Sequence, residues 1–313
     1  MEPSKKFQEL SPADLEELRR AVEILERGSF TARVSQLLGR PFDELMLRLP
    51  EKTTRLIVQL TQQALEHAFE AAIRTLPERE NFSTSPLFHK VASGLSGLVG
   101  GGFGMVGLAL ELPVTVTLML RAIAAIAQRH REDPRDLEVR LHCLEVFALG
   151  EPKAQRNRDR SGYYAVRVML GRSLRRAARE LMQHETLKKG TPFLVQFIQQ
   201  VATRFGLHIS KRVALQMMPT LSAMTTAALN IMFMEFYCEL AEAHFTIREL
   251  ERRYGEQQIE QLYYQLLTQL EEFGERGLSP GRACGDEDQA TRSRLEEGGN
   301  SQGELADASP GPR

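Results

Sequence analysis

The sequence has few cysteines and almost no net charge, and both shortages limit what the protein can be. Its 313 residues include three cysteines, Cys143, Cys238 and Cys284, which lie far apart and form no CxxC pair. This pattern gives no zinc signature and favours free thiols in a reducing compartment. The formal net charge of -1 argues against nucleic-acid binding by the whole surface.

Motifs for secretion and for common enzyme chemistries are also missing. The N-terminal stretch MEPSKKFQELSPADLEELRR has no apolar segment of the kind found in secretory signals, which favours a cytoplasmic location. The chain contains no GK[ST] sequence, and no cysteine has a clear base partner. GxSxG occurs only as GLSPG at 277–281 and GNSQG at 299–303, in the glycine-rich C-terminal stretch and not between a strand and a helix, where a nucleophilic serine would need it. We therefore expect no catalytic residue and no cofactor. A binding role is favoured over an enzymatic one.

The most unusual stretch is SGLSGLVGGGFGMVGLALELPVTV, residues 93–116, which holds seven glycines within fourteen residues. It contains a literal GxGxxG, but it lacks a preceding strand and a following acidic residue at the required distance, so a dinucleotide loop is not expected. Glycines four residues apart instead favour close contact between helices, in lipid or in a soluble core. The candidate close-packing glycines are Gly97, Gly100, Gly101 and Gly104.

Apolar periodicity along the chain predicts an all-α fold. A capped helix should begin at Ser11 and end near Gly28, and residues 51–75 and 161–183 each carry one apolar stripe. The capping box formed by Thr246 and Glu249 predicts another helix start. The remaining expected helices cover 112–128, the segment between the Asp-Pro turn and Gly150, 191–204, and 211–240 with an interruption at Pro219, while FGLHIS is expected to form a turn.

The expected architecture is one multi-helix domain with a glycine-rich, hairpin-like apolar centre, in which the glycine stretch packs against residues 213–234. Residues 1–10 should form a flexible N-terminus and residues 11–274 the helical domain. Residues 275–313 should form a disordered acidic tail, because residues 279–313 contain six glycines, three prolines and only two large apolar residues.

Two features connect the sequence with membranes. Residues 91–110 and 213–234 carry no charge and are long enough to cross about 30 Å of hydrocarbon, but their many small and polar residues leave a membrane span, a peripheral association and a soluble core open. Residues 151–190 carry eleven Lys or Arg against four Asp or Glu. One face of a helix in this segment, solvated or facing anionic lipid, carries Arg172, Arg175, Arg176 and Arg179.

Three polar residues in apolar surroundings are the candidate functional residues: Glu111, Arg121 and Asn230. Glu111 should lie at a helix N-terminus with Pro113 in the first turn, or else in a cleft or a membrane-facing groove. Arg121 lies too far along the helix to pair with Glu111, so each should have its own partner. Asn230 continues a line of polar residues at four-residue spacing and should hydrogen-bond to a neighbouring helix.

A metal site is not expected from the sequence. His142 and Glu145 are three residues apart on one expected helix, but such a pair is common by chance and two more ligands are missing. His244 is interpreted as a residue at the end of a helix, beside the capping box.

One long block, GGFGMVGLALELPVTVTLMLRAIAAIAQRHREDPRDLEVRLHCLEVFALG, closely resembles the signature of the bacterial EcsC family. Further similar pieces are FDELMLRLP, SGYYAVRVML, RFGLHISKRVALQMMPTLSAMTTAALNIMFMEFY and AHFTIRELERRYG, so the resemblance covers about residues 10–260. In MPTLSAMTTAALN, alanine and threonine stand where the family pattern has glycines, which weakens the case for tight packing there. The family is named after the third member of an operon that also encodes an ABC transporter, and its activity is not established. The resemblance therefore implies an association with membranes or transport and supplies no catalytic residue.

The leading hypothesis is a non-enzymatic, cytoplasmic accessory protein at the inner face of the cell membrane. Its partner would be membrane lipid or a membrane transport complex, and not nucleic acid. Two alternatives stay open. One is a hydrolase with a site near Glu111, Arg121 and Asn230, and the other is a soluble scaffold that recruits a partner through its acidic tail.

Overall fold

The computed structural model describes residues 9–27, 30, 33–34, 49–75, 104–150, 162–183, 191–216 and 223–277. The chain divides into two compact units, Met1–Leu270 and Glu271–Arg313, and every contact reported below lies within the first unit. Of the second unit, the described residues are 271–277. Gly97, Gly100 and Gly101, the expected hairpin-like centre and the expected acidic tail beyond residue 277 lie outside the described residues.

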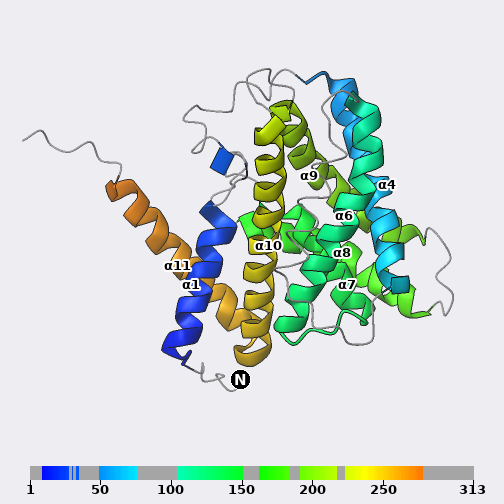
Figure 1. Ribbon diagram of the computed structural model, residues 1–313. Coiled ribbons are helices and arrows are strands. Elements are labelled where there is room, and N and C mark those ends of the chain that lie inside the picture. Colours follow the sequence, from blue (N-terminus) through cyan, green and yellow to red (C-terminus); the bar gives the residue numbers. More distant parts are fainter. Residues whose placement is uncertain are drawn as a thin grey trace, which may run out of the picture. The chain divides into compact units, whose positions relative to one another are not determined.

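Every regular element in the described ranges is a helix, which confirms the all-α class (Figure 1). These elements are α1 (Pro12–Arg27), α4 (Glu51–Thr75), α6 (Gly104–Arg129), α7 (Leu137–Glu145) followed by the 3-10 turn η1 (Val146–Ala148), α8 (Gly162–Gln183), α9 (Pro192–Gln216), α10 (Ala223–Tyr254) and α11 (Glu256–Gly277).

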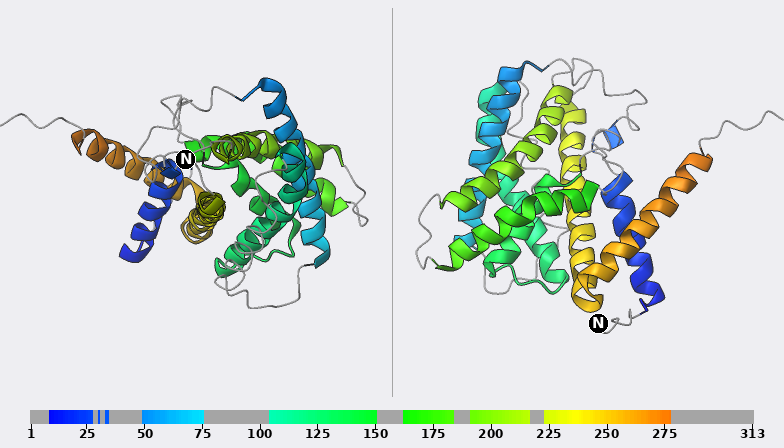
Figure 2. Two further views of the ribbon diagram at one scale, coloured as in Figure 1. Left: turned by 45° about the horizontal axis from the view of Figure 1, so that its top comes forward. Right: turned by 180° about the vertical axis from the view of Figure 1, so that it is seen from behind.

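The long helix α10 organises the first unit. It packs against α1 and against α6, and Figure 1 shows it between these two helices. Helix α4 packs on both α6 and α9, while α8 and α9 lie side by side, as the rear view in Figure 2 shows. Three fully buried rings meet where η1, α9 and α10 converge: Phe147 lies 4.7 Å from Phe205 and 5.6 Å from Tyr237 between ring centroids.

Two sequence predictions about helices are confirmed closely. The Ser11 hydroxyl accepts a hydrogen bond from the backbone N–H of Asp14 at 3.1 Å and caps α1, which ends at Arg27. Every expected apolar position of α8 is buried: Tyr163, Val166, Leu170, Leu174, Ala177 and Leu181. Of the apolar positions expected along α4, Leu65, Ala68 and Phe69 are buried, but Leu56 is 42% exposed and its neighbour Ile57 is fully buried in its place.

The turn expected at FGLHIS is wrong, because α9 runs through this stretch without a break. A Cβ atom on Gly206 would lie 2.7 Å from Cγ2 and 3.1 Å from Cα of Val58 in α4. Both distances are too short for a side chain, so glycine at this position permits the close approach of α9 and α4. The close-packing role that we predicted for the glycine-rich stretch is thus seen at a different glycine.

The helix start expected at Thr246 is also wrong. Helix α10 continues through this residue because Leu240, Phe245, Ile247 and Leu250 extend its buried face. The helix ends at Tyr254, and Gly255 follows with a φ of +93°, a left-handed conformation that favours glycine and closes helices. His244 is therefore an interior, fully buried helical residue and not a helix-end residue.

Pro113 does not begin a helix but lies inside α6, which begins at Gly104. Residues 107–129 of α6 are long and apolar enough to cross a membrane by length and composition. An 18-residue window within them has a mean hydropathy of 1.7, and 56% of that window is buried within the protein. The expected uncharged run 213–234 does not form one described helix, since α9 ends at Gln216 and α10 begins at Ala223.

The described cysteines are free thiols, as expected. Burial raises the pKa of Cys143 to about 12 and that of Cys238 to about 11, so both thiols stay protonated at neutral pH.

Candidate functional site

Glu111 has a partner from another helix. Its carboxylate accepts a hydrogen bond from the guanidinium of Arg212 in α9, and both side chains are at least nine-tenths buried. The same guanidinium lies 5.5 Å from the ring centroid of Phe233 in α10. The prediction that a buried Glu111 needs a partner is confirmed, but its expected position at a helix N-terminus is wrong.

Several buried polar atoms near this pair have no hydrogen-bond partner within the described part of the chain. They are Thr115 Oγ1, Arg212 Nε, both ring nitrogens of His208 and both side-chain polar atoms of Asn230. The interhelical hydrogen bond expected for Asn230 is therefore not formed there. Burial, with the nearby cations Lys211 and Arg204, lowers the pKa of His208 to about 3, so this ring is neutral.

Arg121 is half-buried on α6, ten residues after Glu111. Ten helical residues correspond to about 15 Å of rise, so the two side chains do not share one acid–base site through direct contact. The carboxylate of Glu111 is bound instead by Arg212.

The four arginines predicted to share a face of α8 are all exposed. At about 100° per residue, Arg172, Arg175 and Arg179 lie on one stripe about 80° wide together with Val168 and Met182. Val168 is 55% and Met182 65% exposed, so apolar side chains stand at both ends of the arginine stripe. Beside the stripe, the guanidinium of Arg176 lies 5.5 Å from the ring centroid of Phe193 in α9.

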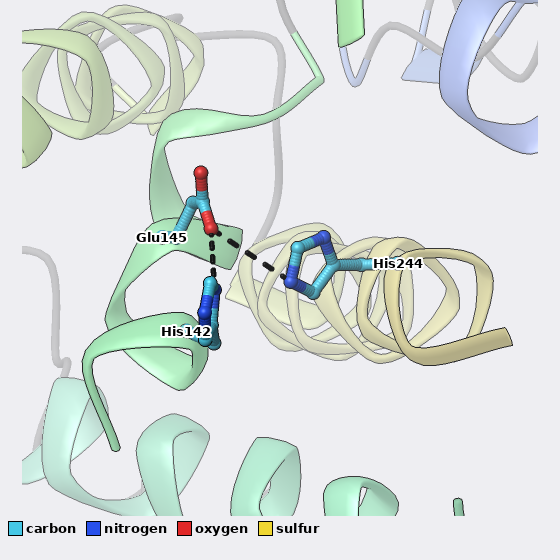
Figure 3. Close-up of side chains that lie close together, drawn as sticks. All are labelled: His142, Glu145 and His244. Carbon is cyan, nitrogen blue, oxygen red and sulfur yellow. Dashed lines mark hydrogen bonds and ion pairs between the residues drawn. The ribbon is translucent and has the colours of Figure 1, made fainter. Parts of the chain in front are cut away.

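A buried cluster that the sequence did not predict lies between α7 and α10. His142 and Glu145 come from α7, His244 comes from α10, and Figure 3 shows the three side chains converging. His142 Nδ1 lies 2.8 Å from Glu145 Oε2, and His244 Nε2 lies 3.9 Å from the same oxygen. The three donor atoms are all within 4.8 Å of one another.

Neighbouring side chains hold this cluster in place. The Tyr163 hydroxyl of α8 lies 3.1 Å from His244 Nδ1. The guanidinium of Arg248 approaches His142 Nε2 at 2.8 Å and donates through its Nε to Glu132 at 2.9 Å. The cluster thus joins α7, α8 and α10.

The burial of the cluster governs its electrostatics. Burial, together with the nearby Arg248 and Arg167, lowers the pKa of His244 well below its usual value, so this ring is neutral. Burial opposes ionisation of Glu145, but the hydrogen bond from His142 and the neighbouring positive charges outweigh it and lower the pKa of this carboxyl. Burial also raises the pKa of the Tyr163 hydroxyl, which stays protonated.

Two turns further along α10 from His244, Glu251 is bound by two side chains of α8. Arg167 of α8 donates to both carboxylate oxygens, at 2.5 and 3.0 Å, and the Tyr164 hydroxyl donates at 3.0 Å. The guanidinium also lies 5.5 and 5.4 Å from the ring centroids of Tyr163 and Tyr164. The charge of the Glu251 carboxylate is thus balanced by that of Arg167 in direct contact.

The sequence did contain a signal for these contacts. In AHFTIRELERRYG, His244, Arg248 and Glu251 follow at spacings of four and three residues, which places them on one face of a helix. The signal was missed because the capping box at Thr246 was taken to begin a new helix.

The described helices define an all-helical protein whose central helix carries buried polar side chains at both of its ends. Residues 4–250 match the EcsC protein family, and the chain belongs to that family. The matched range includes His142, Glu145 and His244. No curated protein and no solved structure matches the chain.

Proposed function

We propose that the protein is a non-enzymatic accessory protein that binds peripherally to an anionic membrane surface through the exposed face of α8. The observation that carries this proposal is the exposed stripe of Arg172, Arg175 and Arg179 between Val168 and Met182. Basic side chains combined with exposed apolar ones suit the boundary between lipid headgroups and acyl chains.

The charges and the apolar residues would act together. Each arginine near an anionic lipid surface contributes about 1 kcal/mol, and burial of Val168, Met182 or Phe193 adds a hydrophobic term. The EcsC family supports the same location, because the operon that gives the family its name encodes an ABC transporter. An association with such a transporter is part of the proposal.

The non-enzymatic role is supported by the state of Glu111. This carboxylate is bound by Arg212 and buried, so it is poorly suited to accept a proton from a substrate. The hydrolase alternative loses the group that would act as its base.

Co-sedimentation with lipid vesicles tests the proposal. The full chain should bind vesicles that contain phosphatidylglycerol, should bind neutral phosphatidylcholine vesicles far less, and should dissociate as salt is raised. Replacing Arg172, Arg175, Arg176 and Arg179 together by glutamine should weaken binding by several hundred-fold, from about 1 kcal/mol per charge.

The matched control replaces the exposed Arg19 and Arg20 of α1 by glutamine, and this variant should bind like the parent chain. Equal binding of the α8 variant and the α1 variant would contradict the proposal. A parent chain that does not bind anionic vesicles at low salt would contradict it as well.

A further inference from the structure

We infer that His142, Glu145 and His244 form a binding site for one divalent transition-metal ion, for which zinc fits the donor set. This inference concerns the interior of the protein and is independent of the proposed membrane binding. Two imidazoles and one carboxylate are a common ligand set for zinc.

The hydrogen bonds of His142 fix which ring nitrogen faces Glu145. A guanidinium can only donate hydrogen bonds, so the approach of Arg248 at 2.8 Å makes His142 Nε2 an acceptor. Nδ1 then donates to Glu145 Oε2 at 2.8 Å. Nδ1 is therefore the nitrogen that would bind an ion beside Glu145.

Glu145 has no direct ion pair with an arginine or a lysine among the described residues. Its side chain is 2% exposed, and Arg167 and Arg248 act on its carboxylate only from beyond ion-pair distance. A buried carboxylate without a charged group in direct contact is costly. A cation at Glu145 Oε2 would reduce this cost.

His244 presents the second unsatisfied group of the cluster. Its Nε2 is fully buried and has no hydrogen-bond partner in the described part of the chain, and at 3.9 Å from Glu145 Oε2 it is too far to donate to that oxygen. When Nδ1–H donates to the Tyr163 hydroxyl, Nε2 carries a lone pair directed at Glu145. Metal-binding histidines are commonly fixed in this way through their other ring nitrogen.

The distances suit an ion between the three side chains. Zinc bonds of about 2.1 Å in a tetrahedral arrangement place the ligand atoms about 3.4 Å apart. The distances of 2.8 and 3.9 Å to Glu145 Oε2 lie on either side of this value. Small side-chain rotations, with the His142 proton moving from Nδ1 to Nε2 as Arg248 turns away from that nitrogen, would therefore complete the site.

The surrounding charges also tolerate a dication. Arg248 keeps Glu132 as a partner when it turns away from His142, and the carboxylate of Glu138, 3.9 Å from His142 Nε2, would move closer to accept a hydrogen bond from that nitrogen. Carboxylates outnumber guanidiniums around the cluster: Glu132, Glu138, Glu145 and Glu251 against Arg167, Arg248 and Arg252.

Metal analysis of the full chain, without a histidine tag and purified without chelator, tests the inference. We expect about one zinc per chain, and after chelation we expect one Co²⁺ to bind with the visible absorption of a low-symmetry site. His244→Phe and Glu145→Gln should abolish binding. Tyr163→Phe, which removes only the hydroxyl beside His244 Nδ1, should keep the site and weaken affinity by about 10–100-fold.

His208→Phe is the matched control, because His208 is also buried and lacks partners for both ring nitrogens but is not part of the cluster. It should bind metal like the parent chain. A folded parent chain that carries no metal and binds neither zinc nor Co²⁺ overturns the inference, and this result needs no variant to fold. Undiminished binding by His244→Phe would overturn it as well.

Discussion

Along its C-terminal half α10 pairs most of the polar side chains that it buries, whereas near its N-terminus both polar side-chain atoms of Asn230 lack a hydrogen-bond partner among the described residues. At the first location, which we call the polar end, Arg248 and Glu251 bind partners on α7 and α8. At the second, the apolar end, Asn230 has no partner within the described residues and Phe233 packs on aromatic rings. The same helix is thus stabilised by matched charges at one end and by ring packing at the other.

The difference predicts opposite responses to mutation. Where charges are matched, removing one partner leaves the other buried and alone, which is strongly destabilising. Where polar atoms are already unpaired, removing them relieves a cost. Four measurements, from the largest expected effect to the smallest, can test this contrast.

The largest effect is expected for Glu251→Gln at the polar end. It leaves the guanidinium of Arg167, 14% exposed, without its counter-ion, and should lower the free energy of unfolding by about 3–5 kcal/mol. Urea denaturation followed by circular dichroism measures this loss.

At the apolar end, the double variant Glu111→Leu, Arg212→Met removes both members of a buried pair and should be neutral or stabilising by about 1–4 kcal/mol. Equal losses of stability for the two variants would contradict the expectation that a buried charge left alone costs more than the removal of a whole pair.

A loss of about 1–3 kcal/mol is expected for Gly206→Ala, because the new methyl group would meet Val58 at 2.7 Å. Thermal unfolding gives the readout. Gly171→Ala is the control: its nearest neighbour is the flexible side chain of Arg175 at 3.4 Å, and alanine should stabilise α8 by about 0.5–1 kcal/mol. If both substitutions stabilised the protein, α9 and α4 would not be packed as closely as described.

Asn230→Leu should raise the free energy of unfolding by about 1–2 kcal/mol, because two buried atoms without partners are removed. Its counterpart at the polar end is Tyr163→Phe, which deprives His244 Nδ1 of its partner and should lower stability by about 1–2 kcal/mol. Urea midpoints of the two variants should therefore shift in opposite directions. A shift in the same direction would show that the two ends do not differ in this respect.

The smallest effect concerns pH. His130, at the end of α6, lies 2.9 Å from both Glu242 and Glu249 of α10, and although burial opposes protonation, these hydrogen bonds raise its pKa. A raised folded-state pKa stabilises the protein below about pH 6.5, and this contribution is lost as pH rises through the folded-state pKa. The parent chain should exceed His130→Gln in stability by about 0.2–1 kcal/mol at pH 6, and the difference should shrink by pH 9. A difference that grows with pH would reverse the assigned sign.

Local patterns predicted much of the helical structure. The Ser11 cap and the apolar stripe of α8 depend on residues within a few turns of one another, so the sequence alone contains the required information. The helix ends were less predictable. FGLHIS contains a glycine that is explained only by Val58, a residue of another helix.

The candidate sites show the same limit. The sequence indicated that a buried Glu111 needs a partner, but it could not identify Arg212, which lies 101 residues further along the chain. The third member of the buried cluster, His244, comes from α10, far in sequence from His142 and Glu145. The pair of His142 and Glu145 on α7 therefore gave no sign of the buried cluster that α7, α8 and α10 form together.

The position of α10 in the chain has a consequence for biosynthesis. Because this helix begins at residue 223 of 313, the ribosome completes α1, α4, α6, α7, α8 and α9 before the element that packs against α1 and α6 exists. Until then, apolar faces such as that of Phe147 and Phe205 lack Tyr237 as their partner. A nascent chain stalled before Tyr254 would therefore leave apolar residues of its future core uncovered, and such surface favours aggregation.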